Sequence, residues 1–249
     1  MLNDQDFLRY SRQLLLEEFG LDAQEKLQAA SVLIVGLGGL GAPAALYLAA
    51  AGVGKLWLAD DDRLHISNLQ RQILYRSSET GQAKAELAKQ HLLALNPHIE
   101  IISLTQRLED DSLAALMSSV DLVLDCSDNM PTRHAVNAAC VASQTPLISG
   151  SAVGFGGQLL VLTPPFVHGC YRCLWPDDSE PQRTCRTAGV LGPVVGTIGT
   201  LQALEALKML AGETSALDGK LRLFDGRQQT WRTLALTRSA SCPLCGGAA

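Results

Sequence analysis

The chain has 249 residues, of which 47% are hydrophobic and 18% charged, and its formal net charge is -5. This length and composition fit one large α/β domain, whereas the acidic balance argues against a nucleic-acid-binding protein, which usually presents a basic face. The first residues lack the basic start and apolar core of a signal peptide, and the longest apolar stretches, such as residues 42–53, are too short for a membrane span. We therefore expect a cytoplasmic protein without a membrane segment.

A helix is predicted for residues 4–18, where Phe7, Leu8, Leu14 and Leu15 alternate with polar residues. This segment precedes the nucleotide-binding pattern, so its apolar side is free to pack against a neighbouring molecule. Closed two-fold pairing is the commonest oligomer, and we expect a homodimer.

A glycine-rich turn follows the first predicted strand. Gly36, Gly38 and Gly41 form a Gly-x-Gly-x-x-Gly pattern, which lets backbone N–H groups approach a phosphate at the start of the predicted helix 41–51. Asp60 ends the next predicted strand, where a ribose-binding carboxylate is expected. These features predict a nucleotide site and fit NAD and ATP equally well.

Amide and cationic side chains follow this pattern closely. Asn68, Gln70, Arg71 and Gln72 lie within one short segment, and Lys84 comes at the start of the next predicted helix. A dinucleotide's pyrophosphate needs little beyond a helix N-terminus, whereas a triphosphate under attack needs fixed positive charge at the phosphorus. The segment therefore favours ATP, although any single one of these charges could be an ordinary solvated residue.

Strand and helix patterns alternate along the first part of the chain. Strands are predicted at 32–35, 56–60, 99–104, 121–125 and 146–149, and helices at 41–51, 83–95, 110–118 and 131–143. This alternation predicts a parallel sheet with right-handed crossovers. Further strands are predicted at 158–163, 220–225 and 230–237, bracketing a helix at 193–210. We expect these later strands to be antiparallel.

Asp128 follows the predicted strand 121–125, with Asn129 beside it. Ligands bind at the carboxyl ends of strands in open α/β sheets, so Asp128 is a candidate Mg²⁺ ligand. It is equally a candidate helix N-cap, because Asp is a favoured cap and Pro131 follows soon after.

Four of the seven cysteines form two Cys-x-x-Cys pairs, Cys170 with Cys173 and Cys242 with Cys245. Each pair can direct two thiolates at one tetrahedral ion, and four thiolates without a nearby histidine favour a structural Zn²⁺ site. Redox-active dithiols are the alternative, although the thioredoxin-like context they usually require is missing.

Several of these motifs together resemble the ThiF/MoeB family, the bacterial relatives of ubiquitin-activating enzymes. The similarity runs from about residue 6 to residue 246. It rests on the two Cys-x-x-Cys pairs and on four segments, 36–41 (GLGGLG), 59–62 (ADDD), 67–72 (SNLQRQ) and 125–129 (DCSDN). Within the family, segment 169–196 and the flanking segment 151–165 are more similar to the ThiF branch than to the MoeB branch.

The resemblance implies a Rossmann-like, mostly parallel sheet with helices on both faces, continued by antiparallel strands and a four-cysteine zinc site. We expect one adenylation domain over residues 1–249. Its expected parts are an N-terminal helical segment (1–30), a nucleotide-binding part (31–150) and a carrier-binding and zinc part (151–249).

The resemblance also implies an activity and its partners. The expected reaction is ATP-dependent adenylation, with Mg²⁺, of the C-terminal glycine of the ubiquitin-like sulfur carrier ThiS. Pyrophosphate is released, and the product serves sulfur transfer for thiazole formation in thiamine biosynthesis. The alternative carrier is MoaD of molybdopterin synthase. A persulfide sulfur donor is a further implied partner, and neither nucleic acid nor membrane is expected.

Transferred residue by residue, the resemblance assigns catalytic roles to Arg71, Lys84, Asp128 and Arg12, with Arg12 reaching the γ-phosphate bound by the other subunit. Nucleotide contacts are implied for Gly36, Gly38, Gly39, Gly41, Asp60, Ser67, Asn68, Leu69, Gln70, Arg71, Lys84, Asp128 and Asn129. What Asp61 and Asp62 do is left open.

Cys185 lies in the polar loop 175–189, where ubiquitin-activating enzymes carry a cysteine that accepts the activated glycine. Two arginines flank it, and neighbouring positive charge raises the thiolate fraction of a thiol. An inert surface thiol is the alternative. Cys126 and Cys140 lie in apolar surroundings and are interpreted as small core residues.

Three other functions compete with adenylation. An NAD(P)-dependent oxidoreductase would need a catalytic acid or base near the nicotinamide, but the five histidines form no recognisable constellation. A zinc-stabilised module that binds a nucleotide or carrier without turnover remains open. A tRNA-modifying cyclase of the same superfamily is disfavoured by the acidic charge and by the zinc-site loop.

Overall fold

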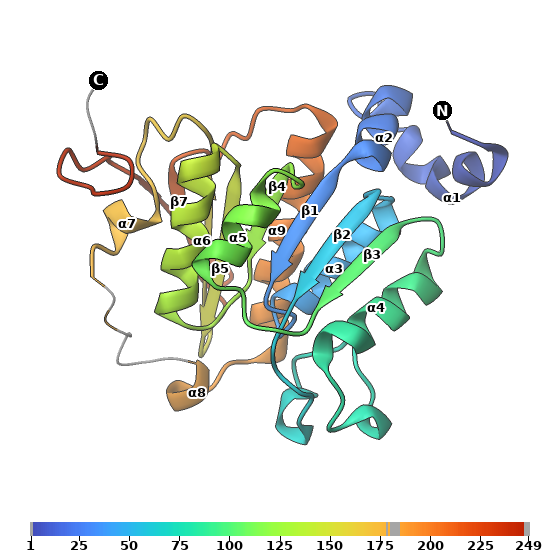
Figure 1. Cartoon of the computed structure of the whole chain (residues 1–249), viewed down its shortest axis with the longest axis horizontal. Coiled ribbons are helices and arrows are strands. Elements are labelled where there is room, and N and C mark those ends of the chain that lie inside the picture. Colours follow the sequence, from blue (N-terminus) through green and yellow to red (C-terminus); the bar gives the residue numbers. More distant parts are fainter. Residues whose placement is uncertain (1, 178, 180–184, 247–249) are drawn as a thin grey trace.

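The structure is a computed structural model that describes residues 2–177, 179 and 185–246, without the side chains of residues 185 and 186. These residues form a three-layer α/β fold around one eight-stranded sheet with the order β3-β2-β1-β4-β5-β6-β7-β8 (Figure 1). The predicted fold class is therefore confirmed. The division into three functional parts within one domain stays a prediction.

Five neighbouring strands are parallel, as the alternating pattern predicts: β1 (Ser31–Val35), β2 (Lys55–Ala59), β3 (Glu100–Leu104), β4 (Leu122–Asp125) and β5 (Leu147–Val153). The sheet continues through antiparallel β6 (Gly156–Leu162), β7 (Lys220–Asp225) and β8 (Thr230–Ala235). Strand β5 is longer than the predicted 146–149 because its second half pairs with β6 across a tight reversal. The carboxyl ends of β1, β2 and β4 consequently share one edge of the sheet.

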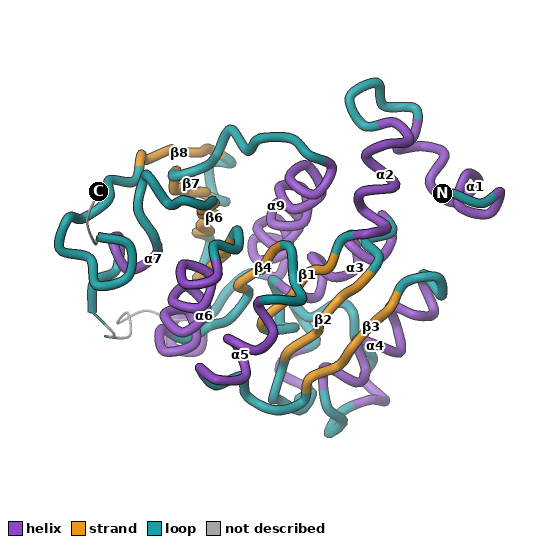
Figure 2. Tube along the Cα trace, turned by 45° about the horizontal axis from the view of Figure 1, so that its top comes forward, coloured by secondary structure: helices purple, strands orange, loops and turns teal. Residues whose placement is uncertain are grey.

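Helices cover both faces of the sheet (Figure 2). One face packs against α3 (Gly41–Ala51), α4 (Lys84–Leu95) and α9 (Gly192–Ala211), and the other against α5 (Asp110–Met117) and α6 (Met130–Ser143). Short helical segments in the connections are η1 (Ile66–Asn68), η2 (Ser77–Glu79), α7 (Tyr171–Leu174) and α8 (Cys185–Ala188). Because both faces are covered, β1 and β4 read as continuous apolar runs in the sequence.

The N-terminal region differs from the prediction. Helix α1 (Asp4–Leu14) begins at a side-chain cap from Asn3 and ends earlier than the predicted residue 18. The sequence analysis also missed α2 (Gly20–Ala29), which contacts α9. A turn separates α1 from α2, so Leu15 does not share a helical face with the apolar residues of α1.

Helix α9 passes the length and hydropathy criteria for a membrane span, and within the described residues it is the one helix that does. Half of that apolar stretch is buried, and the helix packs against α3, β5 and β6. Its apolar character is therefore that of a core helix.

Candidate active site

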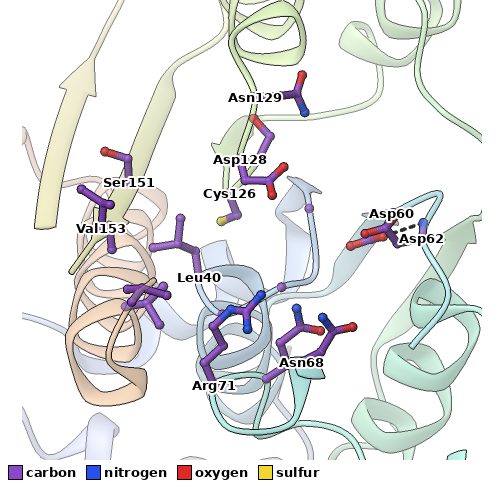
Figure 3. Close-up of a pocket in the computed structure, with 18 of the residues that line it drawn as sticks. Leu40, Asp60, Asp62, Asn68, Arg71, Cys126, Asp128, Asn129, Ser151 and Val153 are labelled. Atoms are coloured by element: carbon purple, nitrogen blue, oxygen red, sulfur yellow. Dashed lines mark hydrogen bonds between the residues drawn. The ribbon is translucent and has the colours of Figure 1, made fainter. Parts of the chain in front are cut away.

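A cavity of about 810 Å³ opens at the carboxyl ends of β1, β2, β4 and β5. In Figure 3, Asp60 and Asp62 lie on one side of it and Ser151 and Val153 on the opposite side. Asp128 lies on the wall between these two sides. The cavity thus joins the ends of four strands into one site, as expected for an open α/β sheet.

The glycine turn forms the part of this cavity nearest α3. Gly36 has φ +90°, and a Cβ there would lie 2.7 Å from the carbonyl oxygen of Cys126. A Cβ at Gly41 would collide with the carbonyl oxygen of Gly36, so only glycine permits this turn. Gly38 and Gly39 both line the cavity.

Asp60 follows directly after β2 and is held by two backbone amides. Its carboxylate accepts hydrogen bonds from Leu37 N at 2.7 Å and from Asp62 N at 2.9 Å. Burial raises the pKa of this carboxyl, and the cation of Lys84 opposes the rise. The side chain thus ties the glycine turn to the end of β2 and presents an oriented acceptor at the cavity.

Lys84 begins α4, and its side chain is only 5% exposed. Its Nζ donates to Asp62 Oδ2 at 2.8 Å, while the Asp62 side chain is 63% exposed. The sequence analysis left the role of Asp62 open, and the structure shows that this residue pairs with Lys84. A cation with one carboxylate partner and a place in the cavity wall is suited to an anionic ligand.

Residues 65–71 form a compact turn on the wall near α3 (Figure 3). Arg71 donates from Nη1 to the carbonyl oxygen of Ser67 at 3.0 Å. The side chains of His65 and Asn68 both make capping bonds around η1. The side-chain oxygen Oδ1 of Asn68 accepts from the backbone N–H of His65 at 3.0 Å. Arg71, Asn68 and Ser67 all line the cavity, as do Lys84 and Asp60.

The structure separates the two interpretations of Asp128. The N-cap of α6 is Asn129, whose side chain accepts from Thr132 N at 3.0 Å. Asp128 is therefore not the cap, and both residues line the cavity.

Not every residue that the sequence analysis selected lies in this cavity. Gly41 shapes the turn from behind, Leu69 packs against the core, and the backbone oxygen of Gln70 faces Gly192. Figure 1 shows α1, which carries Arg12, near the start of the strands, at the edge opposite the cavity. Cys185 begins α8, but its side chain lies outside the described residues.

Arg133 is a cavity residue that the sequence analysis missed. Its buried guanidinium donates to Asp125 Oδ2 at 3.1 Å, to Ser149 Oγ at 3.0 Å and to the Gly150 carbonyl oxygen at 2.9 Å. Burial disfavours this charge, but the Asp125 carboxylate outweighs the effect and raises the pKa of Arg133. The signal available in the sequence was an arginine one turn into a helix that starts beside the strand-ending Asp125.

Cys126 also lines the cavity, as a buried thiol. Burial, reinforced by the Asp125 charge, raises the pKa of its thiol, and its Sγ contacts Gln202 Oε1 at 3.4 Å. Cys126 and Cys140 are both buried, which confirms the interpretation of these thiols as core residues.

The two Cys-x-x-Cys pairs meet at α7 and the C-terminal turn, and none of the four cysteines lines the cavity. The sulfur atoms of Cys170, Cys173, Cys242 and Cys245 all lie within 4.8 Å of one another. Burial disfavours ionisation of Cys242, but the backbone amides of Cys245 and Leu244 outweigh it and lower the pKa of this thiol to about 7. The donor set and its spacing fit a tetrahedral metal ion.

The ThiF family model matches residues 10–244. The chain belongs to the ThiF family. It is 61% identical over 247 residues to the sulfur carrier protein ThiS adenylyltransferase of Escherichia coli (strain K12), covering 99% of this chain and 98% of that protein. It is 47% identical over 245 residues to the molybdopterin-synthase adenylyltransferase of the same strain, covering 98% of each.

A crystal structure of E. coli MccB with ATP has a similar fold. Its TM-score against this chain is 0.82 at 25% sequence identity, and the match covers 98% of this chain and 75% of MccB. These findings confirm the resemblance drawn from the motifs, including the greater similarity to the ThiF branch.

Proposed function

We propose that this ThiF-family protein adenylates the C-terminal glycine of a ThiS-type sulfur carrier with ATP and releases pyrophosphate. The observation that carries the proposal is the gathering of Arg71 and Lys84 with Asp128 around one cavity beside a glycine turn. The 61% identity to a ThiS adenylyltransferase over the full chain supports the same reaction.

In the proposed reaction, a carboxylate oxygen of the terminal glycine attacks the α-phosphorus of ATP. A new C–O–P linkage forms. The bond between the α-phosphorus and the oxygen that bridges it to the β-phosphorus breaks, and pyrophosphate leaves with the electron pair of that bond. Both reactants are anionic, so fixed cations are needed to offset their repulsion. Arg71 and Lys84 supply that charge from the turn and from the start of α4, and Asp60 accepts from the ribose hydroxyls.

Asp128 is the proposed Mg²⁺ ligand, with Asn129 beside it. Its place at the end of β4 suits a hard cation that binds through carboxylate and phosphate oxygens. Asn129, and not Asp128, is the N-cap of α6, which supports this assignment. Mg²⁺ bound with the triphosphate would neutralise part of its charge.

Zn²⁺ is the proposed occupant of the four-cysteine cluster. The cluster joins α7 to the C-terminal turn, so the ion would tie residues 242–245 to the body of the protein. Four cysteine ligands leave no open coordination position for a substrate, and none of them lines the cavity, which supports a structural role. Figure 1 shows α7 and the C-terminal turn on the same side of α6.

We propose ThiS as the carrier and keep MoaD as the second candidate, because the chain is also 47% identical to a molybdopterin-synthase adenylyltransferase. A persulfide donor would then supply the sulfur that displaces AMP from the adenylate. Since ATP and such carriers are intracellular, we place the activity in the cytoplasm.

Cys185 is a proposed acceptor of the activated glycine. Adenylation itself does not require it, so Cys185→Ala, which removes the nucleophile, should retain the first step while preventing a covalent enzyme–carrier conjugate. A conjugate that persists in this variant would exclude the role.

A homodimer is proposed from the position of α1. Because α1 lies at the sheet edge opposite its own cavity, a role for Arg12 at the γ-phosphate requires a second copy of the chain. Phe7 and Leu8 are exposed on this helix and give it apolar surface to bury against a partner.

Carrier-dependent ATP–pyrophosphate exchange tests the proposed function. We expect exchange with ThiS and much weaker exchange with MoaD, each purified and assayed at equal concentration. Preference for MoaD would replace the carrier assignment, whereas a flat result with both carriers and tight ATP binding would support a binding module without turnover.

A further inference from the structure

A histidine side chain caps the turn that carries the proposed phosphate contacts. His65 Nδ1 accepts a hydrogen bond from Ser67 N at 3.2 Å, and the Ser67 hydroxyl lies 2.8 Å from the same nitrogen. An acceptor nitrogen carries no proton, so this contact assigns the tautomer with the proton on Nε2. His65 is exposed and lines the cavity, and its ring is therefore placed for more than core packing.

The backbone amide of His65, and not its ring, orients the Asn68 side chain. The Asn68 side-chain oxygen Oδ1 accepts from this backbone N–H at 3.0 Å, so the side-chain NH2 group of Asn68 is the end available to a ligand. Phosphate oxygens accept hydrogen bonds and cannot donate them once ionised. An Asn68 turned this way is therefore matched to a phosphate.

The same cap is connected to Arg71. His65 holds the backbone of Ser67, and the carbonyl oxygen of Ser67 accepts from Arg71 Nη1 at 3.0 Å. The consecutive bonds run from the His65 ring through Ser67 to the guanidinium. Loss of the ring would leave the Ser67 amide without this acceptor and would loosen the carbonyl group that holds Arg71, because the backbone bonds of the short η1 begin at Asn68 N and do not include the Ser67 amide.

We propose that His65 is a positioning residue of the nucleotide site, whose ring holds Ser67 and, through the Ser67 carbonyl oxygen, Arg71 in the orientation that binds the triphosphate. The inference rests on the proposed function, since it concerns the same ATP. It assigns to a histidine outside the predicted contact residues the task of preorganising two of them, Ser67 and Arg71.

The test compares His65→Ala with His65→Asn and with the control His98→Ala. Asn is among the best N-cap residues and restores a side-chain acceptor, whereas His98 is exposed and does not line the cavity. Binding of ATP is measured by calorimetry, and KM and kcat by carrier-dependent exchange, with thermal unfolding of each variant recorded.

We expect His65→Ala to weaken ATP binding and raise KM for ATP about tenfold, the order expected from loss of one N-cap. His65→Asn should stay within about threefold of wild type, and His98→Ala should be unchanged. In an Arg71→Ala background, His65→Ala should cost clearly less, because the guanidinium that the ring positions through Ser67 is already gone.

If the wild-type protein is active and His65→Ala has unchanged ATP binding and an unchanged KM for ATP, the inference is overturned and the proposed function stays intact. Equal losses in the Ala and Asn variants would also overturn it, because capping would then not be the cause. Absence of carrier-dependent exchange in the wild type would instead refute the proposed function, and the calorimetric comparison would still decide the role of His65.

Discussion

Removal of the Lys84 cation should separate catalysis from stability. The Lys84 side chain is 5% exposed and has Asp62 Oδ2 at 2.8 Å, while Asp62 itself is 63% exposed. When the lysine is lost, water can solvate the remaining carboxylate, so the ion pair contributes at most about 1 kcal/mol to stability. Loss of one preorganised charge from a transition state costs about 10² or more in rate, which corresponds to about 2.7 kcal/mol.

We therefore expect Lys84→Ala to lower carrier-dependent ATP–pyrophosphate exchange by at least about 100-fold. Its free energy of unfolding should change far less than the activation free energy. Lys84→Met keeps the apolar stem of the side chain without the charge and should lose as much activity. The matched control is Lys55→Ala, because Lys55 also pairs with one carboxylate, Glu100 at 3.0 Å, but at the opposite end of β2.

Exchange in Lys84→Met within tenfold of wild type would refute the assignment of transition-state charge to this residue. An equal loss in Lys55→Ala would show that the effect comes from general destabilisation. Asp128→Ala should match the loss in Lys84→Met if both groups act on the triphosphate.

Three further predictions concern pH, metal and assembly. Burial raises the folded-state pKa of Asp60 above its unfolded value, so stability is lost as the pH rises above about 4 until the carboxyl of the folded protein is fully ionised. In denaturant titrations, Asp60→Asn should therefore gain stability relative to wild type as the pH is raised from about 4, and parallel curves would contradict the shift. Metal analysis should return one Zn²⁺ per chain, and Cys173→Ser should lower both zinc content and thermal stability; well-folded protein with far less than one zinc would exclude the site. Mixed Arg12→Ala and Asp128→Ala chains should regain part of the activity that each lacks alone, and no recovery despite proven subunit exchange would place Arg12 outside its partner's site.

The elements that the sequence predicted well are those whose pattern is local. Helix 41–51 matches α3 because a glycine turn starts it and Gly52, in the left-handed conformation, ends it. The four cysteines were paired correctly across a long stretch of chain because thiolates at Cys-x-x-Cys spacing have a metal chemistry of their own.

The features that the sequence did not predict depend on tertiary contacts. Helix α2 lacks a side-chain N-cap and packs against α9, a partner far along the chain. Arg133 reads as an ordinary polar residue until the fold brings it to Asp125 and Ser149. The pairing of Asp62 with Lys84 likewise requires α4 to start beside the end of β2.

Intact-mass spectrometry of the carrier tests the central claim most directly. ThiS incubated with this protein, ATP and Mg²⁺ is predicted to gain the mass of one adenylyl group, that is, AMP less one water, and ThiS lacking its C-terminal glycine should gain nothing. An unmodified full-length ThiS, under conditions where the enzyme is folded and binds ATP, would contradict the account.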